Sequence, residues 1–500
     1  MIRMTRRQFF GTAVGSTAAA SVILGRPTRS VAQPPAPSSV VPVEDARPLV
    51  AAGGQLRPMV ELEEDVYQFQ PANNGAGPMW SHGNTCLVRW KDDVFVSGLE
   101  TLADYPPLNN CRWMLFQRKD DQWLLQQADP NDRTREPCPL SCFQDGRVMM
   151  SVNPTLTTDP AAVAGPARPE ILQFSASDAR AAYKTLLPQW GDSPPFTEHS
   201  YRSFAADGTR NELILFQNIG YTHSRWAFLD QQQRWTTGRL DWLPREDPEK
   251  APYGGAGTRV NYPTVALKDQ SVHFLGNSAF DQWERMPDVG DLKRQWGPRF
   301  RKLYYTWSDD ITTGRFSDWI EIDHCYSTGG WLFSCDLYLA DDGDVHMLWH
   351  ENPIHLTLRN ERFPDIERIW ALKYAVVRRG QVIQRRTLLA GGEVGSTEIP
   401  GRGRFHVTPD GRLFVICYVH GTDVTGTPVS ENRLIELLPD GTGTPPIKLD
   451  MEHPLTVFFT ATMRAGCAPS ATIDLLGTRA GTSGTISYAR IALSPQPGRP

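Results

Sequence analysis

TEHSYRSFAADGTRNELILFQNIGYTH, residues 197–223, predicts a β-hairpin. Two apolar runs, at 201–205 and 212–216, flank a polar turn that contains Asp207 and Gly208, and such a turn between β-rich runs is a hairpin signal. Residues at similar distances from the turn of an antiparallel pair come together at its open end. We therefore expect one crowded end that carries Glu198, His199, Tyr201, Arg202, Tyr221 and His223.

The same arrangement of an apolar run, an aspartate turn and a second β-rich run recurs along the chain. Six turn aspartates follow one another at intervals of 52 to 73 residues: Asp93, Asp145, Asp207, Asp269, Asp342 and Asp410. A seventh unit fits residues 458–476. A period of this length, with one prominent hairpin per unit, is typical of propeller blades with inserted loops. The sequence predicts an all-β fold, a β-propeller with seven blades; six or eight blades and a pair of β-sandwiches are the alternatives.

The N-terminal 58 residues predict export and a linker. The motif TRRQFF at 5–10 precedes an uncharged run at 11–24, and paired arginines before such a run resemble a Tat export signal. Small residues at 30–32 offer a cleavage site, and the run is short for a transmembrane segment. We predict a Tat-type signal peptide at 1–32, a Pro/Ala-rich linker at 33–58 and a single propeller domain at 59–500. The predicted location is periplasmic or secreted, with no transmembrane segment.

The composition of the chain favours some classes of binding partner and disfavours others. A net charge of −5 and a pI near 6.1 disfavour nucleic acid, which selects a basic surface, and 15 tryptophans suit a sugar-facing cleft. The eight cysteines fit no CxxC-type zinc pattern, so buried thiols are the favoured interpretation. Disulfides, and a structural metal site around His324, Cys325 and Cys335, are the alternatives. No cofactor is required for the chemistry that follows, and a structural Ca²⁺ or Zn²⁺ ion is left open.

Polar side chains gather at the strand ends away from the aspartate turns, which in a propeller meet on one face around the central channel. The candidates for substrate contact are His82, Arg202, Tyr221, Arg259, Asn277, Arg404 and His420. Histidine exchanges protons near neutral pH, tyrosine becomes an acid or base beside a cation, and arginine binds carboxylates. Such groups suit proton abstraction next to the carboxylate of a uronic acid. A hydrolase needs two carboxylates instead, for which Glu100, Glu136, Glu198 and Glu351 are available.

Two sequence blocks resemble a known family. EHSYRSFAADG…ELILFQNIGYTH resembles one blade of the BNR-4-type (BNR-repeat) propellers, which include the ulvan lyases, and NYPTVALKDQSVHFLG resembles their next blade. The resemblance implies catalytic roles for His199 and His223, and for Tyr262 in the next blade. Where the family has an arginine at the end of that blade's second strand, this chain has Gly276-Asn277. An arginine elsewhere on the rim must then neutralise the carboxylate: Arg202, Arg259 or Arg404.

The sequence thus predicts an exported polysaccharide lyase that cleaves a uronic-acid-containing, ulvan-like polysaccharide by β-elimination. Its predicted catalytic residues are His199, His223 and Tyr262, its partner is the acidic polysaccharide, and the protein is expected to be a monomer. One alternative is a glycoside hydrolase of the same fold, acting on rhamnosyl-glucuronate linkages or resembling a sialidase. The other is a propeller that binds carbohydrate without catalysis.

Overall fold

A computed structural model describes residues 56–495, except for positions 132, 163, 221, 244–258, 280–299, 326–329, 355–358, 361–362 and 394–396. The predicted signal peptide and most of the predicted linker lie outside the described residues. The first strand, β1 (Leu56–Gln68), begins inside the stretch predicted as linker. No helix among the described residues is long and apolar enough to cross a membrane.

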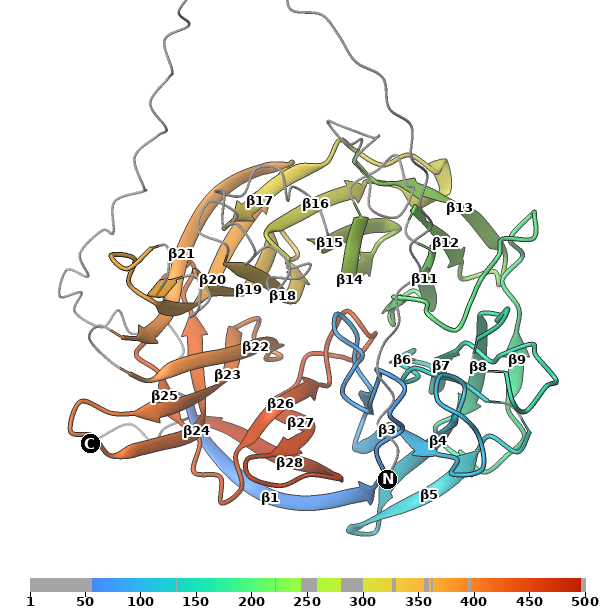
Figure 1. The fold of residues 1–500 in the computed structure, drawn as a ribbon, viewed down its shortest axis with the longest axis horizontal. Helices are drawn as coiled ribbons and strands as arrows, with labels where there is room; N and C mark the ends of the chain where they lie inside the picture. Colours follow the sequence, from blue (N-terminus) through green and yellow to red (C-terminus); the bar gives the residue numbers. More distant parts are fainter. Residues whose placement is uncertain are drawn as a thin grey trace, which may run out of the picture. The chain divides into compact units, whose positions relative to one another are not determined.

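Seven four-stranded antiparallel sheets form a ring, so the prediction of a seven-bladed β-propeller is confirmed (Figure 1). Blade 1 holds β2 (Leu87–Trp90), β3 (Asp93–Thr101), β4 (Cys111–Lys119) and β5 (Gln122–Ala128). Blade 2 holds β6 (Leu140–Cys142), β7 (Arg147–Val152), β8 (Glu170–Ser175) and β9 (Lys184–Leu186). Blade 3 holds β10 (Ser203–Asp207), β11 (Glu212–Ile219), β12 (His223–Leu229) and β13 (Trp235–Asp241).

The second half of the ring repeats this order. Blade 4 holds β14 (Arg259–Lys268), β15 (Ser271–Ala279), β16 (Lys302–Ser308) and β17 (Ile320–His324), with a short 3-10 helix, η3 (Ile311–Thr313), before β17. Blade 5 holds β18 (Trp331–Leu339), β19 (Val345–Asn352), β20 (Ile369–Arg378) and β21 (Gln381–Gly392). Blade 6 holds β22 (Ile399–Val407), β23 (Leu413–Thr422), β24 (Pro428–Leu437) and β25 (Ile447–Lys448). Blade 7 holds β26 (Leu455–Thr460), β27 (Thr472–Arg479) and β28 (Thr485–Pro495), and β1 completes it.

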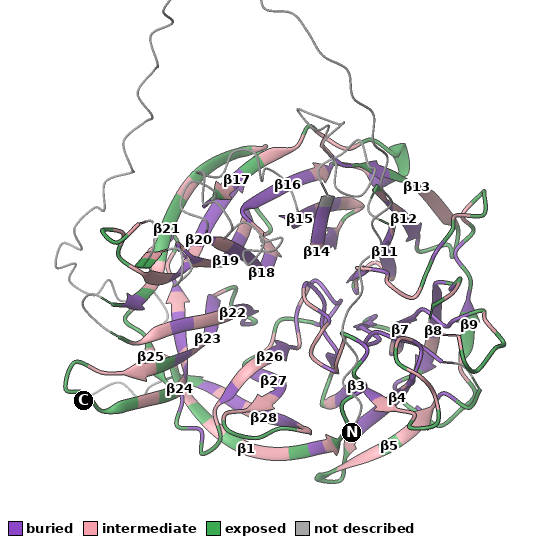
Figure 2. Ribbon diagram, in the orientation of Figure 1, coloured by how far each residue is buried: buried purple, intermediate pink, exposed green. Residues whose placement is uncertain are grey.

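Each predicted aspartate turn joins the first and second strands of one of blades 1 to 6. The hairpin of 197–223 is blade 3, where Asp207 pairs with Glu212 and Ser203 with Phe216. The inner strands are apolar because neighbouring blades cover both of their faces. Every residue of β11 except Ile219 is buried, whereas β21 is mostly exposed or half-buried (Figure 2). One apolar cluster fills each of the seven interfaces between blades.

The two ends of the propeller domain close the ring together. β1 pairs with β28 from Leu56 opposite Pro495 to Gln68 opposite Thr485, so the first strand is the outermost strand of the last blade. This pairing satisfies the backbone groups that β28 presents at its outer edge.

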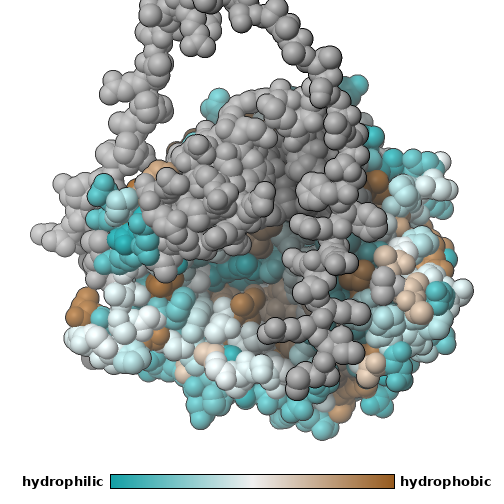
Figure 3. Space-filling model, in the orientation of Figure 1, coloured by the Kyte–Doolittle hydropathy of each residue, from teal (hydrophilic) through white to brown (hydrophobic). Residues whose placement is uncertain are grey.

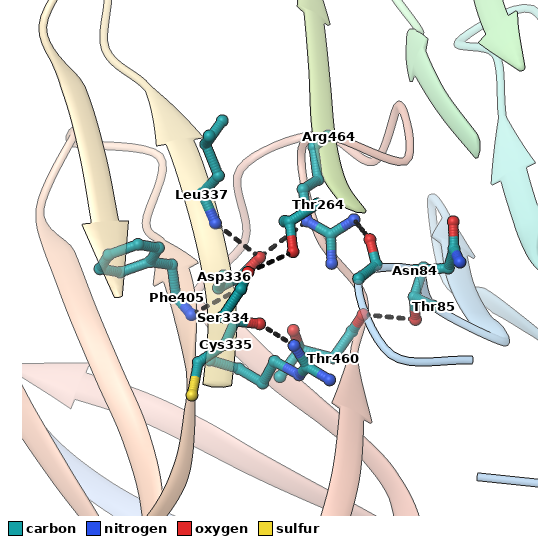
Figure 4. A network of polar contacts seen from close by, with 12 residues as sticks. Asn84, Thr85, Thr264, Ser334, Cys335, Asp336, Leu337, Phe405, Thr460 and Arg464 are labelled. Atoms are coloured by element: carbon teal, nitrogen blue, oxygen red, sulfur yellow. Dashed lines mark hydrogen bonds and ion pairs between the residues drawn. The ribbon is translucent and has the colours of Figure 1, made fainter. Parts of the chain in front are cut away.

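A buried ion pair joins several blades near the channel (Figure 4). Asp336 on β18 accepts hydrogen bonds from Arg464 Nε at 2.7 Å and from the Phe405 amide of β22 at 2.9 Å. Arg464, in the connection between β26 and β27, also donates to the Gly83 carbonyl at 2.7 Å. The two side chains are 0% and 3% exposed. One carboxylate and one guanidinium therefore hold blades 5, 6 and 7 and the segment before blade 1.

Replacing Arg464 by methionine should strongly destabilise the protein, because the Asp336 carboxylate would stay buried without its cation. We expect the free energy of unfolding to fall by about 3–5 kcal/mol, measured by chemical denaturation. The double variant Arg464→Met with Asp336→Asn should lose less than Arg464→Met alone. Arg239→Ala, which breaks the exposed pair with Asp241, is the control and should change it by about 0.5 kcal/mol or less. Equal losses for Arg464→Met and Arg239→Ala would contradict the central role of the buried pair.

Candidate functional site

A cavity of about 690 Å³ opens at the strand ends away from the aspartate turns, a size typical of ligand pockets. Blades 5, 6 and 7 and the segment before β2 line it, and Figure 3 shows hydrophobic surface near the middle of the ring. Aromatic side chains form much of the wall: Phe69, Trp80, Trp331, Trp370 and Tyr418. The titratable polar lining is one arginine and three histidines, and two threonines add hydroxyl groups: His82, His350, Arg402, His420, Thr456 and Thr478. No Asp or Glu is among the described lining residues.

Trp80 is the centre of an aromatic cluster that joins this cavity to blades 3 and 4. Its ring lies 5.7 Å from the ring of His199, 5.6 Å from that of Tyr201 and 5.6 Å from that of Tyr262. Tyr262 also contacts the His82 ring edge-on at 4.9 Å. The structure thus brings together three predicted site residues, His82, His199 and Tyr262, around a tryptophan that the sequence analysis did not select.

Backbone strain accompanies this cluster. Tyr201 precedes β10 and Tyr262 lies within β14, the inner strands of adjacent blades, and their φ angles are +42° and +49°. Bulky residues rarely adopt positive φ, and such strain persists where the surroundings impose it, often at functional sites. The tyrosine rings lie 5.2 Å apart, so the unusual backbone directs both into the same space.

β-Bulges direct two of the site residues. The pairing of β14 with β15 shifts between Asn261 and Thr264, at Tyr262, and the pairing of β22 with β23 shifts between Pro400 and Gly403, at Arg402. A bulge interrupts strand alternation and turns a side chain to a new direction. Arg402 therefore faces the cavity.

His82 is held as a neutral hydrogen-bond donor. Arg402 Nη1 lies 2.8 Å from His82 Nδ1, and because a guanidinium only donates, Nδ1 accepts and the ring proton lies on Nε2. Burial, together with the positive charges of Arg402 and Arg404, lowers the pKa of His82 well below its ordinary value. The Arg402 guanidinium lies 3.6 Å above the Phe333 ring, and burial lowers the pKa of Arg402 to about 10.

His350 lines the same cavity and is 7% exposed. Its ring packs 5.5 Å from that of Trp331. The Pro400 carbonyl lies nearby, but neither ring nitrogen makes a hydrogen bond of good geometry to a described residue. Burial and the charge of Arg402 lower the pKa of His350 to about 4. The ring is therefore neutral near pH 7 and offers a donor and an acceptor beside the cavity.

Three other predicted side chains bond the protein's own backbone or side chains. Arg202 donates to the carbonyls of Glu136 and Pro137, and Arg404 donates to those of Cys335 and Phe458. Asn277 accepts from the Ser334 amide at 2.8 Å. All three are buried and tie neighbouring blades or segments together.

Of the four remaining predicted side chains, two are described and two are not. His223 begins β12, where its Nδ1 lies 2.8 Å from the Thr222 hydroxyl and where burial and Arg239 lower its pKa. His420 is exposed and stacks on Tyr418 at the cavity wall. Tyr221 and the side chain of Arg259 lie outside the described residues.

Sequence reasoning missed Arg402, which supplies the cavity's arginine. The run GRGRF at 401–405 contains two alternating arginines, and of these only Arg404 is predicted to contact the substrate. Period-two alternation places both arginines on one face, and the bulge at Arg402 breaks that alternation. A bulge of this kind has no short sequence signature.

No three His, Cys, Asp or Glu side chains of the described residues are placed to share a metal ion. All eight cysteines are described, and they are buried free thiols, as the favoured interpretation predicted. The prediction of a reaction without a cofactor stays a prediction.

No protein-family model and no curated protein match this sequence. Similar solved structures include an α-L-arabinofuranosidase from Fusarium graminearum (11% identity, covering 75% of this chain and 98% of the other, TM-score 0.38). Others are an α-L-arabinanase from Penicillium chrysogenum (8%, 71% and 92%, 0.35) and an apocarotenoid oxygenase from Synechocystis (11%, 89% and 95%, 0.39). Similarity this low carries no argument about activity. The protein's class is therefore given by its own fold, a seven-bladed β-propeller, and membership of the BNR-4-type family stays a prediction.

Replacing His350 should reduce the amount by which the free energy of unfolding falls as the pH is lowered. Its pKa falls from 6.5 to about 4 on folding, so between these pH values the unfolded chain binds a proton that the folded protein excludes. Stability is lost as the pH falls through this window, by up to about 3 kcal/mol for this group. His350→Gln should therefore lose less stability than the wild type between pH 6.5 and pH 4, measured by denaturation. The exposed His420→Gln is the control; identical profiles for wild type and His350→Gln would refute the assignment.

Proposed function

We propose that this protein is a polysaccharide lyase that binds an acidic polysaccharide and cleaves it by β-elimination. The polysaccharide would bind in the cavity of about 690 Å³ that Trp80 lines, called the Trp80 cavity below. The observation that carries the proposal is the composition of the cavity wall. It presents aromatic rings, the neutral imidazoles of His82 and His350 and one half-buried arginine, Arg402, with no carboxylate among its described residues. Such a wall attracts an anionic ligand with apolar faces, and a uronic-acid-containing polysaccharide has both properties.

Arg402 is the residue we assign to the substrate carboxylate. Arginine forms two parallel hydrogen bonds to a carboxylate, and its attraction is stronger where water is excluded. Its position on the Phe333 ring and its bond to His82 hold the guanidinium in one direction. Arg402 would thus replace the arginine that the BNR-4-type family has at the end of the second strand of the Tyr262 blade. It comes from a different blade, blade 6.

In the proposed reaction, a base removes the proton from the carbon next to the carboxylate. The electron pair forms a carbon–carbon double bond, the bond to the glycosidic oxygen breaks, and an acid protonates that oxygen. We assign the base to His199 and the acid to Tyr262, which flank Trp80. Negative charge develops on the substrate carboxylate, and Arg402 and the Nε2 proton of His82, both on the cavity wall, stabilise it. His223 has no step in this scheme.

A glycoside hydrolase is the second candidate, and Glu136 favours it. This carboxyl lines a small adjoining cavity with Tyr201 and Tyr262, and burial raises its pKa, as suits a general acid. Its oxygens accept hydrogen bonds from the amide and hydroxyl of Ser200. Hydrolysis calls for a second carboxylate, and Glu136 is the only one among the described lining residues of the two cavities.

Incubation with a panel of uronate polysaccharides should yield products that absorb in the ultraviolet, because β-elimination leaves an unsaturated uronate. Tyr262→Phe should lower kcat by about 10²–10⁴-fold through loss of the acid, with a smaller change in KM. Lys184→Ala, on the exposed strand β9, is the control and should be fully active. New reducing ends without ultraviolet absorbance would select the hydrolase, and binding without any product would select a non-catalytic propeller.

Arg402→Met should weaken binding of the native polysaccharide and leave binding of its carboxyl-reduced form nearly unchanged. The loss should be on the order of 2–3 kcal/mol, since a charge-assisted pair in a partly buried site disappears. Calorimetric titration of both forms against both proteins measures the difference. Equal weakening for the two ligands would show that Arg402 shapes the cavity but does not bind the carboxylate.

A further inference from the structure

Two thiols meet at the joint between blades 1, 2 and 7. Cys142 ends β6, Cys467 lies in the connection between β26 and β27, and their Sγ atoms are 3.8 Å apart. The Cys142 amide donates to the Ala465 carbonyl at 2.8 Å, so the two backbones are already bonded side by side. This is the one thiol–thiol contact among the eight cysteines, all of which the structure describes. A disulfide needs the sulfurs to approach to about 2.05 Å, so at least one of the two side chains must rotate to form the bond.

A second cavity leads to this pair from the opposite face. It has a volume of about 380 Å³ and lies among the aspartate turns, with Asp207 and Lys268 in its wall. Cys467 lines it beside Gly466 and Ala468, whereas Cys142 is not among its lining residues. One sulfur of the pair is thus reachable by a small molecule, and the other lies directly behind it.

The surroundings distinguish the two sulfurs chemically. The Arg89 amide donates to Cys467 Sγ at 3.4 Å, and the Cys142 thiol lies in hydrogen-bond contact with the same sulfur. These donors lower the pKa of Cys467, while the same contact and burial raise the pKa of Cys142. The thiolate is the attacking species in disulfide exchange, so the reachable sulfur is also the nucleophilic one.

We propose that Cys142 and Cys467 form a disulfide by exchange with a small disulfide that enters through the aspartate-turn cavity. The Cys467 thiolate attacks one sulfur of the oxidant, breaks its S–S bond and releases one thiol. Cys142 then gives up its proton and attacks Cys467, which forms the protein disulfide and releases the second thiol. The two cysteines are oxidised by two electrons and the small disulfide is reduced to two thiols. The bridge links blade 2 covalently to the last blade, across the place where the ring closes.

The test uses the purified full chain incubated with reduced and oxidised glutathione at increasing ratios. After alkylation under denaturing conditions, mass spectrometry should show the loss of two alkylatable thiols and a crosslinked peptide containing residues 142 and 467. The bridge closes a long loop, so the oxidised protein should unfold at a temperature higher by about 5 °C. A second sample is refolded in the oxidant, so that slow entry into the folded protein does not hide the bridge.

Cys467→Ser and Cys142→Ser should each abolish both the crosslink and the shift. Cys325→Ser is the matched control, because Cys325 is 6% exposed, as is Cys467, and it should retain both. Free Cys142 and Cys467 in both samples at the most oxidising ratio would overturn the proposal. A bridge that forms only during refolding would overturn the entry route through the cavity.

Discussion

The Asp336–Arg464 pair is the interaction on which the ring depends. A propeller blade contacts its neighbours through apolar faces, and those contacts are non-directional. The pair makes the contacts between blades directional. The Asp336 carboxylate accepts hydrogen bonds from blade 6 and from Arg464, and Arg464 also donates to the Gly83 carbonyl before blade 1. Two unpaired charges at this depth would be far less stable than the pair, so an arrangement that separates them is excluded. The inner strands are thereby held at fixed positions around the channel.

The candidate site requires this rigidity because its residues come from separate blades. Tyr262 lies on blade 4, Arg402 on blade 6, and His82 before blade 1. Tyr262 and Tyr201 hold unfavourable backbone angles, which a loosely packed centre would release. Bulges add a second requirement, since each turns a side chain inward only while its strand stays paired. The rigid ring therefore maintains both the strain and the directions of the cavity side chains.

Much of the fold was predictable because turn chemistry is local. Asp207 and Gly208 mark their hairpin whatever surrounds it, and five further aspartate turns repeat the signal. The outermost strands were harder to predict: β21 reads QVIQRRTLLAGG, without regular alternation, because most of its residues are exposed or half-buried and burial therefore constrains few of its side chains. His199 and Tyr262 were both expected at the rim, and the structure brings both rings next to Trp80. Arg402 escaped prediction because its direction is set by a bulge, and Trp80 because its contacts come from blades distant in sequence.

The two cavities use the same ring in different ways. At the Trp80 face, Arg402 and the neutral imidazoles of His82 and His350 line a cavity that aromatic rings make partly apolar, so the carboxylate of the proposed substrate would meet a cation with little competing water. At the aspartate-turn face, backbone and thiol donors converge on Cys467, so the nucleophile there is a sulfur. Arg464 lines the second cavity and also holds Gly83, one residue from His82. The central ion pair thus links the two ends of the channel. A substitution that displaced the pair would disturb both the Trp80 cavity and the surroundings of Cys467.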